Sequence, residues 1–147
     1  MTTSVLYVCL GNICRSPTAE GVLRQLAGNR DLLIDSAGTG AWHVGDPPDP
    51  RAIAEARRRS IDISGLRARQ VRAEDFHIFD HILAMDSSNI ATLKRICPSA
   101  SKADLRLCLS DASELGETDV PDPYYDNGFD RAYELIEAAA KGLLQRI

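Results

Sequence analysis

The sequence predicts an α/β fold, in which one parallel sheet is covered by helices on both faces. Apolar, β-branched segments alternate four times with segments of helical periodicity, each strand preceding a helix. The chain has 147 residues, of which 44% are hydrophobic, and neither an internal repeat nor a linker divides it. We therefore expect a single three-layer domain over residues 1–147.

The first predicted strand covers residues 5–8 and leads directly into Cys9. A short loop follows, and a helix begins near Arg15 and ends at Gly28. α/β proteins build anion sites where a strand feeds a loop and a helix amino terminus, because unpaired N–H groups converge there and the helix dipole favours negative charge. We expect a phosphate-sized oxyanion to bind here.

The remaining strands and helices follow the same alternation. The expected strands are residues 32–38, 79–85 and 103–109. The expected helices are residues 51–60, started by Asp49 and Pro50, residues 86–97, capped by Asp86, and residues 129–147, with a short helical turn at 73–76. The strand order 2-1-3-4 of a small flavodoxin-like fold would place the end of the first strand at the topological switch point, where Cys9 lies.

Cys9 and Arg15 frame the loop after the first strand. A thiol beside N–H donors, a fixed cation and a helix amino terminus is expected to ionise below the ordinary pKa of about 8.5, in a range of roughly 3.5–7.5. The thiolate would act as a nucleophile, and Arg15 would hold two oxygens of a phosphoryl group bidentately. The loop residues expected to contact the anion are Leu10, Gly11, Asn12, Ile13 and Cys14.

Ser16 fits two roles. Its hydroxyl can cap the helix that Pro17 starts, or it can give its hydrogen to the Cys9 sulfur and stabilise the thiolate as a leaving group. If only one of these is true, capping is the simpler expectation.

Composition excludes several classes of protein. The net charge of −4 argues against nucleic acid as the main partner. No apolar run approaches the ~18 residues of a membrane span, and the amino terminus has no secretory signal, so we expect a cytoplasmic protein. We expect no metal and no cofactor, because the three histidines are scattered and no cysteine pair has the CxxC spacing. Reduced thiols are expected for Cys9, Cys14, Cys97 and Cys108.

A second chemical feature lies near the carboxyl end. The expected loop at residues 110–130 holds seven carboxylates and no Lys or Arg. Asp122 is the candidate general acid and base, since hydrolysis of a phosphate ester needs a proton for the leaving group. Tyr124 and Tyr125, with Trp42 from the loop at 38–50, would form an aromatic slot deep enough for phosphotyrosine. Taken alone, Asp122 and the tyrosines also fit an ordinary surface turn.

Together these segments resemble the low-molecular-weight protein tyrosine phosphatases, in their bacterial form. The resemblance covers essentially the whole chain, at residues 9–21 (CLGNICRSPTAEG), 36–39, 45–52 (GDPPDPRA), 68–71 (ARQV), 79–89 (FDHILAMDSSN) and 122–127 (DPYYDN).

The resemblance implies a role for each matching residue. It implies that Cys9 is the nucleophile, Arg15 the transition-state clamp, Asp122 the general acid and Ser16 the thiolate stabiliser. Three further residues are assigned through it: Asn12, which holds the strained loop, Ser36, its hydrogen-bond partner, and Cys14, which can form a reversible disulfide with Cys9.

The resemblance also implies the partners. The substrate is expected to be a phosphotyrosine-containing protein, for a bacterial source a tyrosine kinase, with inorganic phosphate as product and a monomeric enzyme. One position departs from the family, since many members carry histidine where this chain has Leu66. We expect this change to soften the loop slightly and to leave the enzyme active.

Two rival readings remain. An arsenate reductase uses the same fold and loop but passes oxidation to further cysteines, for which Cys97 and Cys108 are available. A non-enzymatic phosphotyrosine-binding module would be expected to lose Cys9 or Asp122, and this chain keeps both. A metal hydrolase is disfavoured because the sequence has no cluster of histidine and aspartate.

Overall fold

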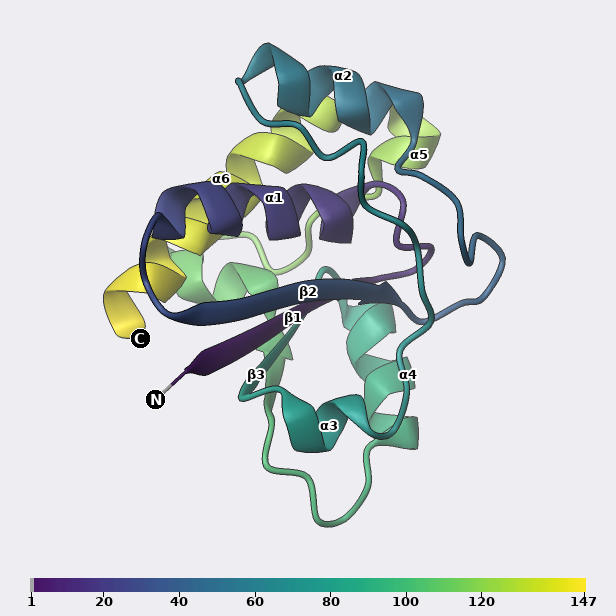
Figure 1. Ribbon diagram of the computed structural model, residues 1–147, viewed down its shortest axis with the longest axis vertical. Coiled ribbons are helices and arrows are strands. Elements are labelled where there is room, and N and C mark those ends of the chain that lie inside the picture. The colour runs from purple at the N-terminus through teal and green to yellow at the C-terminus, as the bar shows by residue number, and fades with distance from the viewer. Residues whose placement is uncertain (1) are drawn as a thin grey trace.

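The computed structural model describes residues 2–147 and contains a four-stranded parallel sheet (Figure 1). The strands are β1 (Thr3–Cys9), β2 (Leu32–Gly38), β3 (His81–Ala84) and β4 (Asp104–Leu107). Their order is β2-β1-β3-β4, with Cys9 opposite Gly38 and Val8 opposite Ala84. The predicted fold class and strand order are therefore confirmed.

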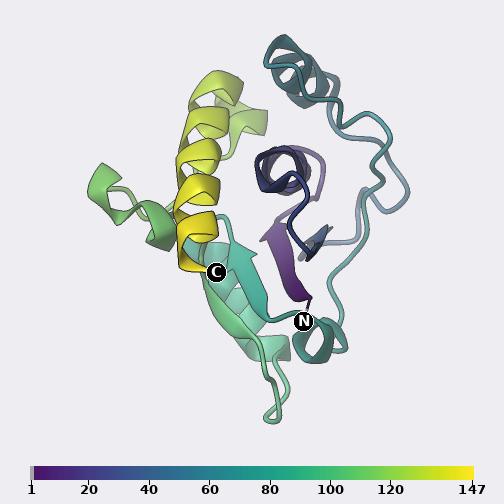
Figure 2. The same ribbon diagram turned by 60° about the vertical axis from the view of Figure 1, so that its left-hand side comes forward.

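Helices cover both faces of this sheet. They are α1 (Arg15–Ala27), α2 (Pro50–Arg58), α3 (Asp75–Ile78), α4 (Ser87–Ile96), α5 (Pro123–Asp126) and α6 (Phe129–Arg146), with a 3-10 helix, η1, at Cys108–Leu115. Figures 1 and 2 show α1 and α6 on one face and α3 and α4 on the other. No helix within residues 2–147 is long and apolar enough to cross a membrane.

β1 lies at the centre of the sheet and is buried on both faces. Val5 and Tyr7 belong to the hydrophobic cluster under α1 and α6, whereas Leu6 and Val8 belong to the cluster under α3 and α4. A strand with two covered faces needs an unbroken apolar run, which is what the sequence supplies. Cys9 consequently stands at the carboxyl end of the central strand, at the switch point of the topology.

Several predicted helix boundaries are confirmed by their caps. Gly28 ends α1 with a φ of 57°, and the Asp49 side chain caps α2 by accepting from the Arg51 N–H. Asp86 caps α4 in a capping box with Asn89. These signals lie within a few residues of the element they control, so they can be found in the sequence.

The region after β3 was predicted less well. The fourth strand ends at Leu107 instead of residue 109, and the predicted strand position of Cys108 is wrong, because this cysteine begins η1. The predicted loop at 110–130 contains most of η1 and all of α5. A short buried apolar run has the same pattern in a strand and in a tight helix, and periodicity alone cannot separate them.

Candidate active site

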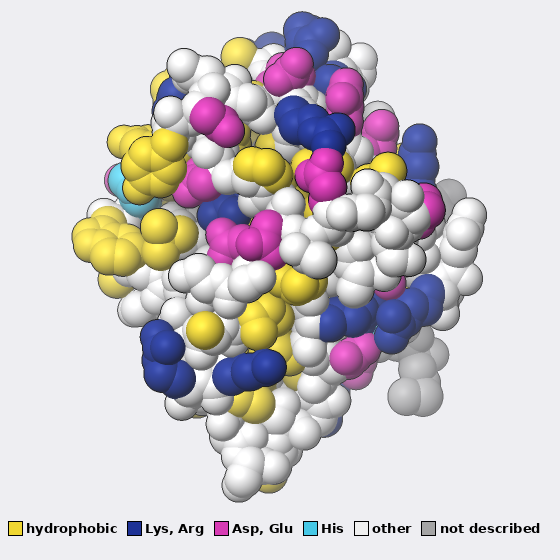
Figure 3. All heavy atoms as spheres, turned by 180° about the vertical axis from the view of Figure 1, so that it is seen from behind, with side chains coloured by type: hydrophobic (Ala, Val, Ile, Leu, Met, Phe, Trp, Pro, Cys, Tyr) yellow, Lys and Arg dark blue, Asp and Glu magenta, His cyan; other side chains and the backbone are white. Residues whose placement is uncertain are grey.

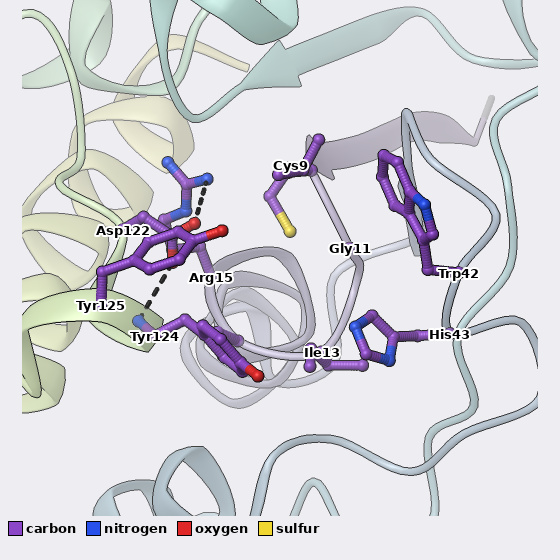
Figure 4. Close-up of a pocket in the computed structure, with 11 residues that line it drawn as sticks. Cys9, Gly11, Ile13, Arg15, Trp42, His43, Asp122, Tyr124 and Tyr125 are labelled. Carbon is purple, nitrogen blue, oxygen red and sulfur yellow. Dashed lines mark hydrogen bonds and ion pairs between the residues drawn. The ribbon is translucent and has the colours of Figure 1, made fainter.

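A cavity of about 260 Å³ opens at the carboxyl end of β1 (Figure 4). It brings together residues from both ends of the chain: Cys9, Leu10, Gly11, Ile13, Cys14, Arg15, Trp42, His43, Asp122, Tyr124 and Tyr125. Every predicted loop contact except Asn12 is in the lining. Cys97 and Cys108 are not among the lining residues, so the cysteines needed by an arsenate reductase do not face this cavity.

The Cys9 sulfur is almost completely buried and is surrounded by donors. The Asn12 N–H donates to Sγ at 3.3 Å, and the Ser16 hydroxyl lies 3.0 Å from Sγ. The amino terminus of α1 begins at Arg15, on the same loop. Hydrogen bonds and a helix amino terminus both favour negative charge, so the surroundings of this sulfur suit an anion.

Ser16 does not cap α1, and that expectation is wrong. The helix begins at Arg15, two residues before Pro17, with Cys14 at the cap position and no capping hydrogen bond from its side chain. Ser16 therefore lies inside the first turn, where its hydroxyl approaches Cys9 Sγ and, at 3.3 Å, the Ala37 carbonyl oxygen. The loop enters the helix earlier than the proline signal indicated, which frees this hydroxyl for the sulfur.

Asn12 holds the loop through its side chain. Its backbone is left-handed, with a φ of 57°, a conformation that asparagine tolerates better than most residues. Asn12 Nδ2 donates to Ser16 Oγ at 2.7 Å and to Ser36 Oγ at 3.0 Å, while Oδ1 accepts from the Arg69 N–H at 3.0 Å. Three bonds to three parts of the chain fix both the loop and the amide orientation.

Glu20 completes this network and was missed from the sequence. Its buried Oε1 accepts from the Ser36 hydroxyl at 2.7 Å. Because Asn12 donates to both serines and Ser36 donates to Glu20, each hydroxyl directs its own hydrogen away from Asn12. The Ser16 hydrogen is then shared between the Cys9 sulfur at 3.0 Å and the Ala37 carbonyl oxygen at 3.3 Å. The one available signal was an acidic residue one helical turn after Ser16, on the buried side of α1.

Leu66, at the position where many relatives have histidine, is partly buried and packs against the core cluster under α1. Each polar atom of the Asn12 side chain nevertheless has a partner. The slightly softer loop expected from this replacement stays a prediction.

Arg15 is held on one side and open on the other. Nη1 donates to Asp86 Oδ2 at 2.7 Å and to the Val120 carbonyl oxygen at 2.9 Å, and Nη2 lies 3.4 Å from Asp122 Oδ2. The buried Nε has no partner within residues 2–147. Burial by itself would lower the pKa of the guanidinium, but Cys9, the Asp86 hydrogen bond and Asp122 raise it. Asp86, predicted only as a helix cap, thus also orients Arg15.

Asp122 projects from the amino terminus of α5. Its Oδ1 accepts from the Tyr124 N–H at 3.1 Å, which makes Asp122 the cap of this one-turn helix. Its Oδ2 faces Arg15. About a quarter of the side chain is exposed, so the carboxyl group can reach both the cavity and solvent.

Aromatic residues form two walls of the cavity. Figure 4 shows Trp42 and His43 across the cavity from Tyr124 and Tyr125, with the Cys9 sulfur between them. Hydrophobic side chains also gather around one histidine at an edge of the surface in Figure 3. His43 was missed, although it follows Trp42 directly.

The position of Trp42 depends on a glycine. A Cβ at Gly40 would lie 1.7 Å from the Trp42 ring, so only glycine lets the indole fold over this part of the loop. The loop thereby places an aromatic ring against the cavity while Trp42 as a residue stays 73% exposed.

Cys14 lies beside Cys9 in the lining but in a different environment. Both cysteines are free. Burial, and then the negative charges of Asp49 and Cys9, raise the pKa of the Cys14 thiol far above its ordinary value. Cys14 is therefore a neutral thiol.

The described residues 2–147 contain no group of three or more His, Cys, Asp or Glu side chains arranged to hold a metal ion. The polar groups that line the cavity include the Cys9 sulfur, the Arg15 guanidinium and the Asp122 carboxyl group.

Several known proteins are similar to this chain over nearly its whole length. The low molecular weight protein-tyrosine-phosphatase YfkJ of Bacillus subtilis is 41% identical over 148 residues, covering 98% of this chain and 95% of YfkJ. The crystal structure of YfkJ gives a TM-score of 0.94 at 40% identity, covering 100% of this chain and 95% of that one. The low molecular weight phosphotyrosine protein phosphatase of Schizosaccharomyces pombe is 43% identical over 150 residues, covering 97% and 96%.

A structure described as DARP, drosophila arginine phosphatase, gives a TM-score of 0.90 at 32% identity, covering 97% of this chain and 96% of that one. The sequence profile of the family described as "Low molecular weight phosphotyrosine protein phosphatase" matches residues 4–147. The chain belongs to the low molecular weight phosphotyrosine protein phosphatases.

Proposed function

We propose that this enzyme, acting as one domain over residues 1–147, hydrolyses phosphotyrosine through a cysteinyl-phosphate intermediate. The convergence of Cys9, Arg15 and Asp122 on one aromatic-walled cavity carries the proposal. These three groups are a nucleophile, an oxyanion clamp and a proton donor, which together suffice for metal-free transfer of a phosphoryl group.

In the first step the Cys9 thiolate attacks phosphorus, so that a sulfur–phosphorus bond forms and the bond to the phenol oxygen breaks. Protonated Asp122 gives its proton to that oxygen. The Nε–H of Arg15 and the second hydrogen of Nη2 point the same way and hold two phosphoryl oxygens, because Nη1 is already occupied by Asp86 and Val120.

In the second step the Asp122 carboxylate takes a proton from water, which attacks the phosphocysteine. The sulfur–phosphorus bond breaks, inorganic phosphate leaves, and Cys9 departs as a thiolate. The Ser16 hydroxyl, 3.0 Å from Sγ, stabilises the leaving sulfur, and the Asn12, Ser36 and Glu20 network keeps it in that position.

The aromatic walls define the preferred substrate. Trp42 on one side and Tyr124 and Tyr125 on the other suit a flat phenyl ring, and Leu10 and Ile13 add apolar surface. A phosphoserine side chain would leave these walls uncovered. The proposed partner is a phosphotyrosine-containing protein in the cytoplasm, such as a tyrosine kinase, and the enzyme acts as a monomer.

The likeness to DARP makes phosphoarginine a second candidate substrate. The two substrates differ in the group next to the phosphate that the cavity walls must contact. The guanidinium of phosphoarginine needs polar partners, and the phenyl ring of phosphotyrosine needs apolar ones. The lining of this cavity favours the phenyl ring.

The test uses matched peptides bearing phosphotyrosine, phosphoserine or phosphoarginine, assayed with a metal chelator. We expect turnover of the phosphotyrosine peptide only, lost in Cys9→Ser and reduced about 10²–10⁴-fold in Asp122→Ala, the usual contribution of a general acid. Preferred turnover of phosphoarginine would replace the substrate assignment. Activity of Cys9→Ser at the wild-type level would contradict the mechanism.

We also propose that Cys14 protects the nucleophile from oxidation. A peroxide would oxidise the Cys9 thiolate to a sulfenic acid, which Cys14 then condenses with to give a disulfide and water. After brief peroxide treatment we expect full recovery of activity on adding a thiol, and permanent loss in Cys14→Ser. Equal recovery in both would remove this role.

A further inference from the structure

Arg51, in the first turn of α2, lies between the loop that carries Cys9 and the segment that carries Asp122. It contacts both, through Asp49 on one side and through α5 and its flanking residues on the other. Figure 1 shows α2 and α5 as neighbours at the same end of the molecule. A single side chain thus connects the two halves of the active site.

On the side of the loop, Arg51 is fixed by a two-point ion pair. Nε donates to Asp49 Oδ1 at 3.1 Å and Nη2 donates to Asp49 Oδ2 at 3.0 Å. Asp49 is itself almost completely buried, and its N–H donates to the Ile13 carbonyl oxygen at 2.8 Å. The direction of the guanidinium is therefore set by the loop around the phosphate site.

On the other side, Arg51 contacts the end of α5. Nη1 donates to Asn127 Oδ1 at 2.6 Å, and the guanidinium carbon lies 5.3 Å from the centre of the Tyr124 ring and 4.9 Å from that of Phe129. Both distances fall within the range of cation–π attraction. This residue therefore holds three side chains of the segment that follows Asp122.

These contacts reach Asp122 through one turn of helix. Asn127 ends α5 with a left-handed φ of 59°, and its N–H donates to the Pro123 carbonyl oxygen at 2.8 Å. Asp122 caps the other end of the same turn. Asn127 and Asp122 thus bound the same helical turn, and we expect a displacement of Asn127 to move the carboxyl group as well.

We propose that Arg51 is a positioning residue that sets the distance between the Asp122 carboxyl group and the substrate oxygen it protonates. The inference rests on the proposed function, in which Asp122 is the general acid. It assigns to Arg51 a part in proton transfer only, without contact to the phosphoryl group.

The test is a series of aryl phosphates whose phenols differ in pKa, with kcat/KM measured for each. Poor leaving groups need the proton and good ones do not, so a misplaced acid affects only the former. For Arg51→Met we expect kcat/KM to fall by roughly tenfold with the poorest leaving group and by less than about twofold with the best. Arg51→Lys keeps the charge but loses the two-point ion pair with Asp49. With the poorest leaving group, its kcat/KM should lie between those of Arg51→Met and wild type.

Two further variants make the test specific. Asn127→Gly keeps the left-handed backbone and removes only the acceptor for Arg51, so it should give the same dependence on the leaving group. Arg59→Met, at the residue that ends α2, is the matched control: its guanidinium lies 4.5 Å from the Tyr133 ring and bonds Glu55 and Glu134, away from α5. Arg59→Met should leave the dependence of kcat/KM on the leaving group unchanged.

The double variant Arg51→Met with Asp122→Asn decides the mechanism. If Arg51 acts through the acid, adding its replacement to Asp122→Asn has no further effect on the poor leaving groups. A uniform loss across the series, or additive losses in the double variant, would overturn the inference while leaving Asp122 in its role. If Asp122→Asn itself shows no dependence on the leaving group, the acid role fails and the inference with it.

Discussion

At the scale of single residues, two cysteines in one cavity are expected to react differently. Cys9 is approached by two donors, whereas burial raises the pKa of the Cys14 thiol and keeps it neutral. With limiting iodoacetamide at neutral pH we expect labelling of Cys9, with Cys14 labelled only at strongly alkaline pH. Peptide mass spectrometry after labelling at several pH values measures both rates.

Inorganic phosphate provides the control for this experiment, since it should slow labelling of Cys9 by occupying the cavity. Faster labelling of Cys14 than of Cys9 at neutral pH would contradict the assignment of the nucleophile.

Residues with a chemical motif could be placed from the sequence, and their supports could not. Cys9 and Arg15 share one short loop, so their spacing alone brings them together. Glu20 and Asp86 act through partners that the fold supplies. Glu20, in α1, accepts from Ser36 on β2, and Asp86 accepts from Arg15. A carboxylate in a helix, or at its cap, gives no sign of such a distant partner.

At the scale of elements, Asp49 stabilises α2 with its charge as well as its cap. The hydrogen bond with Arg51 lowers the pKa of Asp49. A lowered pKa means that the charged form contributes stability above the unfolded pKa of about 3.9, and that this contribution is lost as pH falls through the folded value. Asp49→Asn keeps a capping oxygen, so at pH 7 it should cost only about 1 kcal/mol of unfolding free energy.

Urea unfolding of Asp49→Asn and wild type at pH 7 and pH 3 checks this expectation. The difference in unfolding free energy between Asp49→Asn and wild type should shrink toward zero at the lower pH. The exposed variant Glu114→Gln should have the unfolding free energy of wild type at both pH values. An equal loss of unfolding free energy at pH 7 and pH 3 would show that the charge of Asp49 does not contribute to stability.

At Gly142, where α6 packs against η1, packing and helix propensity predict opposite effects of an alanine on stability. A Cβ at Gly142 would lie 1.8 Å from the Asp111 carbonyl oxygen, on the backbone of η1. Alanine should raise helix propensity by about 1 kcal/mol, but the clash should cost about 1–3 kcal/mol and force the elements apart. We therefore expect Gly142→Ala to lower the midpoint of thermal unfolding.

Gly65→Ala is the matched control for Gly142→Ala, because nothing lies within 4 Å of a Cβ at Gly65. It should change stability by less than about 0.5 kcal/mol. A more stable Gly142→Ala protein would mean that η1 moves aside freely.

The elements that the sequence missed, η1 and α5, lie between β4 and α6. Asp122 and Pro123 carry a proper start signal for a helix, but α5 is four residues long and has no periodicity to support that signal. η1 likewise follows β4 without a break in its apolar pattern. Longer elements with caps, such as α2 and α4, were recognised.

At the scale of the whole molecule, the parallel sheet positions the loop of Cys9 and Arg15, and long-range hydrogen bonds bring the segment of Asp122 to it. The strand order was predictable because strands and helices alternate, and that order places the end of β1 next to the end of β3. The approach of the segment around Asp122 was not predictable from alternation. It depends on long-range bonds, such as those from Val120 N–H to Met85 and from Arg15 to Val120.

The most direct test of the whole account is the isolation of the covalent intermediate. A phosphotyrosine peptide is mixed with the enzyme, the reaction is stopped with acid within its first turnovers, and the cysteine-containing peptides are analysed by mass spectrometry. The account predicts a phosphoryl group on Cys9, absent in Cys9→Ser and absent from Cys14. Turnover with no phosphoryl group on Cys9, and retained in Cys9→Ser, would contradict it.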